Sequence, residues 1–154
     1  MAFQAAGTEF KVNATSVSTA TITSPVVATA ANGDFVVVWK FPYSSSDSDL
    51  KFRRFNANGT PKDIVDGTIA GETNNEYQPA VAMKSDGSFV VAYVRETSGN
   101  QDVLVRRFDA NGNLIGSEIA VATSDATKNQ FDPAIAMDAA GNFCCCMDAR
   151  VFCD

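Results

Sequence analysis

Short runs of apolar and β-branched residues alternate with polar turns along the whole chain. Between residues 79 and 112 an apolar run begins at Pro79, a turn follows, a second run spans 89–94, and a third run ends at Phe108. Runs of this length, bounded by Gly, Asn, Asp and Ser, are typical of β-strands. Because no long helical periodicity is present, the pattern predicts an all-β fold of antiparallel strands joined by short turns.

The same pattern occurs three times. Successive copies of three landmark residues are 54 positions apart: Pro25, Pro79 and Pro133; Gly33, Gly87 and Gly141; Phe35, Phe89 and Phe143. A period of this size is typical of solenoids, propellers and other arrays. Each unit is predicted to hold four strands. The first opens with the proline, the second follows a turn such as Asn32-Gly33, the third ends in Arg-Arg-Phe, and the fourth is weaker. We expect both central residues of the turn to have positive φ.

Two details of the pattern favour units arranged about an axis. The second strand of each unit is apolar at successive positions, which suits a sheet covered on both faces. The first strand is rich in small residues that would fit a crowded innermost position: Ala28, Ala80, Ala82, Ala134 and Ala136. The prediction is a partial β-propeller of four-stranded antiparallel blades. An array of small β-sandwich units is the alternative.

The repeat divides the chain into four parts. Residues 1–23 are predicted to be the last strand of a preceding blade plus a connector, since residues 7–13 match residues 116–122. Residues 24–77 and 78–130 form blades one and two, and residues 131–154 begin a third blade. Propellers usually have four to eight blades. We therefore expect the ring to be completed by the remaining blades of a longer chain or by a homo-oligomer.

Charge and composition limit the classes of partner and of activity that the sequence supports. The net charge of −6 and the pI near 4.5 make nucleic acid and anionic lipid unfavourable partners. The chain has no apolar run long enough for a membrane span, and no signal peptide is visible at its start. Histidine, the commonest general base, is absent. We find no catalytic site in the sequence and expect no enzyme.

All four cysteines lie near the C-terminus: Cys144, Cys145, Cys146 and Cys153. Residues 143–147 (Phe-Cys-Cys-Cys-Met) stand where the first unit has Phe-Val-Val-Val-Trp and the second has Phe-Val-Val-Ala-Tyr. One base string, TTTTGTTGTTGTATGG, encodes Phe-Cys-Cys-Cys-Met when read from its first base and Phe-Val-Val-Val-Trp when read from its second base. We therefore hypothesise a frameshift that also truncates the third unit. Buried thiols are one alternative. A metal or redox role is another, although adjacent strand residues face opposite ways.

The consensus Pro-x-Val-Ala, Asp/Asn-Gly-x-Phe-Val-Val-x-Trp/Tyr, Arg-Arg-Phe-Asp-Ala-Asn-Gly and Gly-x-Glu-Phe-x-Val-Asn resembles a bacterial tandem repeat. Such repeats occur in large secreted or surface proteins, often beside haemolysin-type calcium-binding or cadherin-like domains. The resemblance covers residues 7–143. It implies an extracellular or cell-surface, propeller-like module with an adhesive or scaffolding role. Family members often carry Asp-Gly-Asp-Gly-like loops after the second strand, whereas this chain has Ser-Asp-Ser-Asp and Ser-Gly-Asn-Gln-Asp.

Two sets of polar residues are candidates for binding. The third-strand arginines could clamp a carboxylate or an acidic sugar, or form structural ion pairs: Arg53, Arg54, Arg106 and Arg107. Three loop carboxylates could bind calcium, or cap their own turns: Asp47, Asp49 and Asp102. No other cofactor is expected.

Three functions follow from these observations. The first is a non-catalytic structural or adhesive module that contacts proteins or glycans. The second is a lectin-like ligand-binding propeller. The third, a glycosidase-type propeller, would need a carboxylate pair or an activated nucleophile.

Overall fold

The computed structural model describes residues 7–14, 21–121, 128–147 and 150–154. These residues form eleven β-strands and no helix, which confirms the predicted all-β class. No helix among them is therefore long and apolar enough to cross a membrane. The residues considered for a signal peptide, and most of the predicted connector, lie outside the described ranges. The strands are β1 (Thr23–Thr29), β2 (Phe35–Pro42), β3 (Ser48–Phe55), β4 (Gly67–Ala70), β5 (Asn75–Met83), β6 (Phe89–Thr97), β7 (Asn100–Phe108), β8 (Leu114–Ala120), β9 (Ala134–Met137), β10 (Phe143–Met147) and β11 (Arg150–Cys153).

The strands group into units that follow the sequence repeat. Strands β1 to β4 pair antiparallel in order as the first unit, and β5 to β8 as the second. Strands β9, β10 and β11 form a separate three-stranded sheet, the third unit. A single parallel bridge between Ser48 and Asn75 joins the first two units into one sheet of eight strands.

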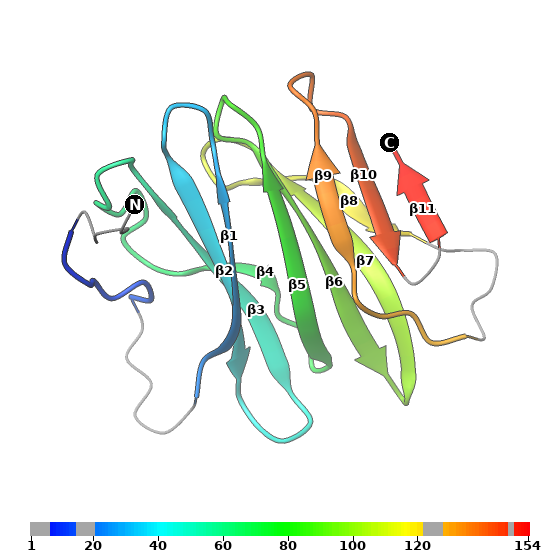
Figure 1. Ribbon diagram of the computed structural model, residues 1–154. Helices are drawn as coiled ribbons and strands as arrows, with labels where there is room; N and C mark the ends of the chain where they lie inside the picture. The colour runs from blue at the N-terminus through cyan, green and yellow to red at the C-terminus, as the bar shows by residue number, and fades with distance from the viewer. Residues whose placement is uncertain (1–6, 15–20, 122–127, 148–149) are drawn as a thin grey trace, which may run out of the picture.

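The first strands of the three units lie next to one another. Strand β5 contacts both β1 and β9, and Figure 1 shows the three running side by side while the other strands of each unit extend away from them. The small residues that the sequence places on these strands allow this close approach: Ala28 is packed against the core shared with the second unit, and Ala80 against the core shared with the third.

Two apolar cores lie between the units, not within them. On β6, Phe89, Val91 and Tyr93 face the first unit and join a core with Val36, Phe52 and Ile69, among others. The intervening Val90, Ala92 and Val94 face the third unit and join a core with Phe143, Cys145 and Met147. The expectation that the second strand is covered on both faces is therefore confirmed for β6, whose residues 89–94 are all buried.

Five hairpin turns have one construction, which differs from the predicted one. In the first, the Ala30 N–H donates to the Asp34 carbonyl (2.7 Å) and the Gly33 N–H donates to the Ala30 carbonyl (2.9 Å). Gly33 has φ of +88°, but Asn32 does not have positive φ. The prediction of two positive φ angles was therefore wrong. A turn followed by one left-handed glycine needs only that residue to lack a Cβ.

The N-terminal segment also differs from its prediction. Residues 7–14 form no strand, although residues 1–23 were expected to contribute one. A strand needs a hydrogen-bonded neighbour, and the described residues include no third strand of a preceding unit. The segment still packs against the first unit: the Phe10 ring lies 5.5 Å from that of Phe55, and the Ala14 N–H donates to Asp66 (2.7 Å).

Candidate functional site

The first strands of the three units, β1, β5 and β9, which we call the inner strands, share a local distortion at one repeat position, within β1 and β5 and just before β9. Ser24, Gln78 and Asp132 have φ of 54°, 51° and 52°, a left-handed conformation that is uncommon for residues other than glycine. Each precedes one of the repeated prolines. The pairing register shifts here, between Thr23 and Val26 on β1 and in the same way on β5.

The bulge corrects the predicted place of the prolines. Pro25 and Pro79 do not open their strands but lie inside β1 and β5, and only Pro133 precedes its strand. The ladder skips Ser24 and Pro25, and likewise Gln78 and Pro79. Because a bulged residue needs no ladder hydrogen bond, a proline without an N–H is tolerated there.

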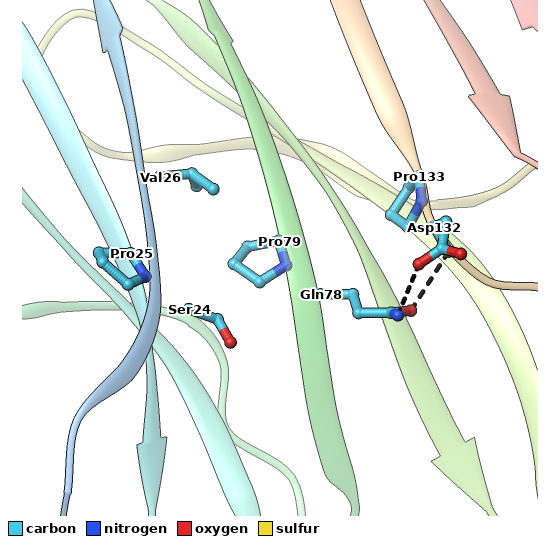
Figure 2. Close-up of a pocket in the computed structure, with 7 residues that line it drawn as sticks. All are labelled: Ser24, Pro25, Val26, Gln78, Pro79, Asp132 and Pro133. Carbon is cyan, nitrogen blue, oxygen red and sulfur yellow. Dashed lines mark hydrogen bonds between the residues drawn. The ribbon is translucent and has the colours of Figure 1, made fainter.

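These distorted positions line a pocket of about 330 Å³ between β1, β5 and β9. Figure 2 shows its lining side chains, with the ring of Pro79 on β5 between β1 and β9, and with Gln78 directed toward Asp132 of the next unit. We call it the axial pocket. Its lining residues are Ser24, Pro25, Val26, Gln78, Pro79, Asp132 and Pro133.

One pair of hydrogen bonds fixes the polar side of the axial pocket. The Gln78 Nε2 donates to Asp132 Oδ1 (2.7 Å), and the Asp132 N–H donates to Gln78 Oε1 (3.2 Å). The two residues are 54 positions apart and occupy equivalent places in neighbouring units. The pair therefore links the inner strands β5 and β9 and holds both side chains in place.

A second group of polar residues lies where the first and second units meet. Arg95 donates from Nε to Glu76 Oε1 (3.0 Å) and from Nη1 to Glu118 Oε1 (2.7 Å). Arg106 donates from Nε to Glu118 Oε2 (2.9 Å), and the Tyr93 hydroxyl also donates to Glu118. Glu72 lies on the outer side of this inter-unit polar cluster, which we define as Glu72, Glu76, Tyr93, Arg95, Arg106 and Glu118.

Burial and pairing move the pKa values of the two inner carboxyls apart. Glu76 is fully buried, and this burial raises its pKa to about 7 despite the hydrogen bond from Arg95. Its Oε2 has no hydrogen-bond partner among the described residues. Burial alone would raise the pKa of Glu118, but hydrogen bonds from Tyr93 and Arg95 hold it below its usual range. The two carboxylates thus have opposite effects on stability as pH changes.

The four arginines predicted as ligand-binding residues contact protein groups on both sides of their units. Arg53 and Arg106 point toward the preceding part of the chain. Arg53 donates to the carbonyl of Val12, which precedes the first unit (3.0 Å), and Arg106 donates to the carbonyl of Ile69 in the first unit (2.7 Å). Arg54 and Arg107 point toward the following unit, where Arg54 donates to the Ala110 carbonyl and Arg107 to Asp154. Neighbouring strand residues do face opposite ways, as expected.

Arg54 has the most complete set of partners. It is buried, and its guanidinium and backbone N–H both bind the Asp63 carboxylate. These contacts correspond to the structural reading that the sequence left open. A ligand-binding role for the four arginines stays a prediction.

The three carboxylates predicted as a possible calcium site are not brought together. Asp49 pairs with Lys51 (2.9 Å), and Asp102 accepts a hydrogen bond from Asn100 (2.8 Å) in the other unit. The Asp47 carbonyl accepts the N–H groups of its own turn, while Asp47 Oδ1 is buried without a partner among the described residues. In the part of the chain that the structure describes, no three His, Cys, Asp or Glu side chains gather as a metal site.

The cysteine run occupies the expected strand. Cys145 is buried, whereas Cys144 and Cys146 lie on the exposed face of β10, so adjacent thiols do face opposite ways. Cys144 forms a disulfide with Cys153 on β11, its antiparallel partner. The sequence interpretation missed this bond. The frameshift concerns the coding DNA and stays a hypothesis.

Sequence reasoning also missed the axial pocket and the buried Glu76. The signal for the pocket was present, because Ser24, Gln78 and Asp132 each precede a proline of the repeat. A residue before proline is restricted in its backbone angles. Glu76 carried no such signal, since a lone glutamate beside asparagines resembles a loop residue.

A scan against models of known protein families and a search of curated proteins found no match to this chain.

Proposed function

We propose that the chain is a non-catalytic structural and adhesive module, part of a β-propeller in a bacterial extracellular or surface protein. The four-stranded units are its blades, and the strands β1, β5 and β9 line its central axis. Further blades of a longer chain, or further copies, would complete the ring. The module would contact proteins or glycans through its outer surface.

One observation carries the proposal: the repeated residues of each unit are used to join it to its neighbours. The stacked rings of Phe89 and Phe108 (4.8 Å between centroids) receive Phe52 of the first unit, at 5.2 and 5.3 Å. In the first unit, Phe55 stacks on Phe35 and its ring also contacts that of Phe10 (5.5 Å between centroids). A repeat whose regularly spaced residues pack between neighbouring units is expected of a structural scaffold.

The charged residues support the same proposal. Arg54 and Arg106 each donate a hydrogen bond to a backbone carbonyl of a neighbouring unit, so these repeated arginines help to join the units.

Two measurements test this function together. The chain, biotinylated and gathered on streptavidin, is applied to arrays of glycans and of extracellular matrix proteins, because gathering copies raises weak affinity. The same chain is incubated with a broad panel of chromogenic glycosides. We expect retention on at least one surface and no turnover. Turnover of a glycoside that Glu118→Gln abolishes would contradict the non-catalytic part. A folded chain that binds no surface would contradict the adhesive part.

A further inference from the structure

We propose that the axial pocket binds the hydroxyl groups of a neutral saccharide. This goes beyond the scaffold role and does not depend on it, since a structural module needs no pocket at its axis. The inference rests on the shape of the pocket, on the polar atoms left open in it, and on its apolar wall.

The shape of the pocket is preformed by the backbone. Left-handed φ angles at Ser24, Gln78 and Asp132 cost free energy and persist only where the surrounding structure fixes them. Here each precedes a proline whose φ is itself restricted, and Ser24 and Gln78 also lie in the bulges of β1 and β5. The volume of about 330 Å³ lies at the lower end of the roughly 300–1,000 Å³ of small-molecule sites.

The open polar atoms match a hydroxyl, which both donates and accepts. Asp132 uses Oδ1 to accept from Gln78, while Asp132 Oδ2 and the Ser24 hydroxyl have no hydrogen-bond partner within the described part of the chain. A carboxylate oxygen accepts, a serine hydroxyl does both, and the second N–H of the Gln78 amide donates. Two neighbouring sugar hydroxyls can therefore be satisfied by Asp132 and Gln78 together.

The remaining wall favours a saccharide over other ligands. Val26 and the rings of Pro25, Pro79 and Pro133 offer carbon surface for the C–H face of a sugar ring. The Asp132 carboxylate disfavours anions, and the net charge of −6 adds to this effect. A divalent cation would meet only one carboxylate in the pocket, far fewer charged oxygens than such ions usually take.

The test is an NMR titration of the whole chain with hexoses and N-acetylhexosamines up to tens of millimolar, and separately with ethylamine and calcium chloride. We expect a saccharide to shift the Gln78 side-chain amide and the Ser24 backbone signal. Asp132→Asn keeps the size of the side chain but removes the charge, and should weaken binding by about tenfold to a hundredfold. Glu9→Gln, the same change on an exposed residue outside the pocket, should leave it unchanged.

Each other result overturns the proposal. Absence of shifts with every sugar would do so, as would a sugar that binds Asp132→Asn as tightly as the original chain. Shifts produced by ethylamine or calcium alone would identify a cation site instead. If Asp132→Asn does not fold, Ser24→Ala takes its place, with a weaker but still measurable loss of affinity. The glycoside assay and the array of matrix proteins above do not depend on the pocket, so failure here leaves the scaffold function standing.

Discussion

The fully buried Glu76 predicts a specific pH dependence of stability. Burial raises its pKa from the usual 4.5 to about 7, with Asp49 and Glu72 adding to the rise and Arg95 opposing it. Because the folded chain binds this proton more tightly than the unfolded chain, the free energy of unfolding falls as pH rises. The contribution is fully present below about pH 4.5 and lost by about pH 7. Its size is about 3 kcal/mol, from a pKa difference of about 2.5 units.

The variant Glu76→Gln removes this titration while keeping the shape of the side chain. Gln130 lies 54 positions after Glu76, at the equivalent place in the next unit, and is also buried. Its Oε1 accepts a hydrogen bond from the Val103 N–H (3.0 Å), so this repeat position accepts an amide side chain. We expect Glu76→Gln to be more stable than the original chain at pH 8 by up to about 3 kcal/mol. At about pH 5.5 the advantage should shrink to about 1 kcal/mol.

Urea unfolding followed by the fluorescence of Trp39 measures this difference. Trp39 is the only tryptophan in the sequence, and it is buried on strand β2 of the first unit. The measurements are made above pH 5, because the chain has its pI near 4.5. Glu118→Gln is the matched comparison: the pKa of Glu118 is lowered, so this variant should lose stability at neutral pH. A difference between Glu76→Gln and the original chain that does not change with pH would refute the reasoning.

Four further substitutions test the contacts between and within the units. Asp63→Asn should cost about 3 kcal/mol in urea unfolding, because it leaves the buried Arg54 guanidinium without its carboxylate; a cost below 1 kcal/mol would argue against a buried pair. Phe52→Ala should cost about 3–5 kcal/mol, whereas Phe10→Ala, at a ring that is 52% exposed, should cost about 1 kcal/mol or less; equal costs would contradict the described packing. Gly33→Ala should lower the melting temperature, since its φ is +88° and an added Cβ would lie 2.9 Å from the nearest side chain; an unchanged value would contradict the turn geometry.

The sequence predicted the features that repeat and are local. The all-β class, the strand order within each unit and the two covered faces of residues 89–94 all follow from alternation and turn residues. The position of the turns was also right. The kind of turn was not, because a glycine after Asn or Asp fits several hairpin types, and the sequence does not show which residues adopt positive φ.

The sequence could not predict what depends on contacts across units. Gln78 and Asp132 meet because the inner strands lie side by side, and Glu76 is fully buried in the polar cluster where the first two units meet. The Cys144–Cys153 disulfide likewise depends on how β11 pairs with β10. Glu76 in particular resembles an ordinary loop residue in the sequence, because nothing in its neighbourhood shows which groups will cover it.

Scanning calorimetry tests the central claim, that the units are held together by the apolar cores between them and by arginine hydrogen bonds to the neighbouring unit. If so, no unit is stable alone, and the chain should unfold in one transition whose calorimetric and van't Hoff enthalpies agree. Asp63→Asn and Phe52→Ala should move that transition as a whole. An array of self-sufficient β-sandwich units would instead unfold in separate steps. Two or more resolved transitions, only one of which responds to these changes, would contradict the account.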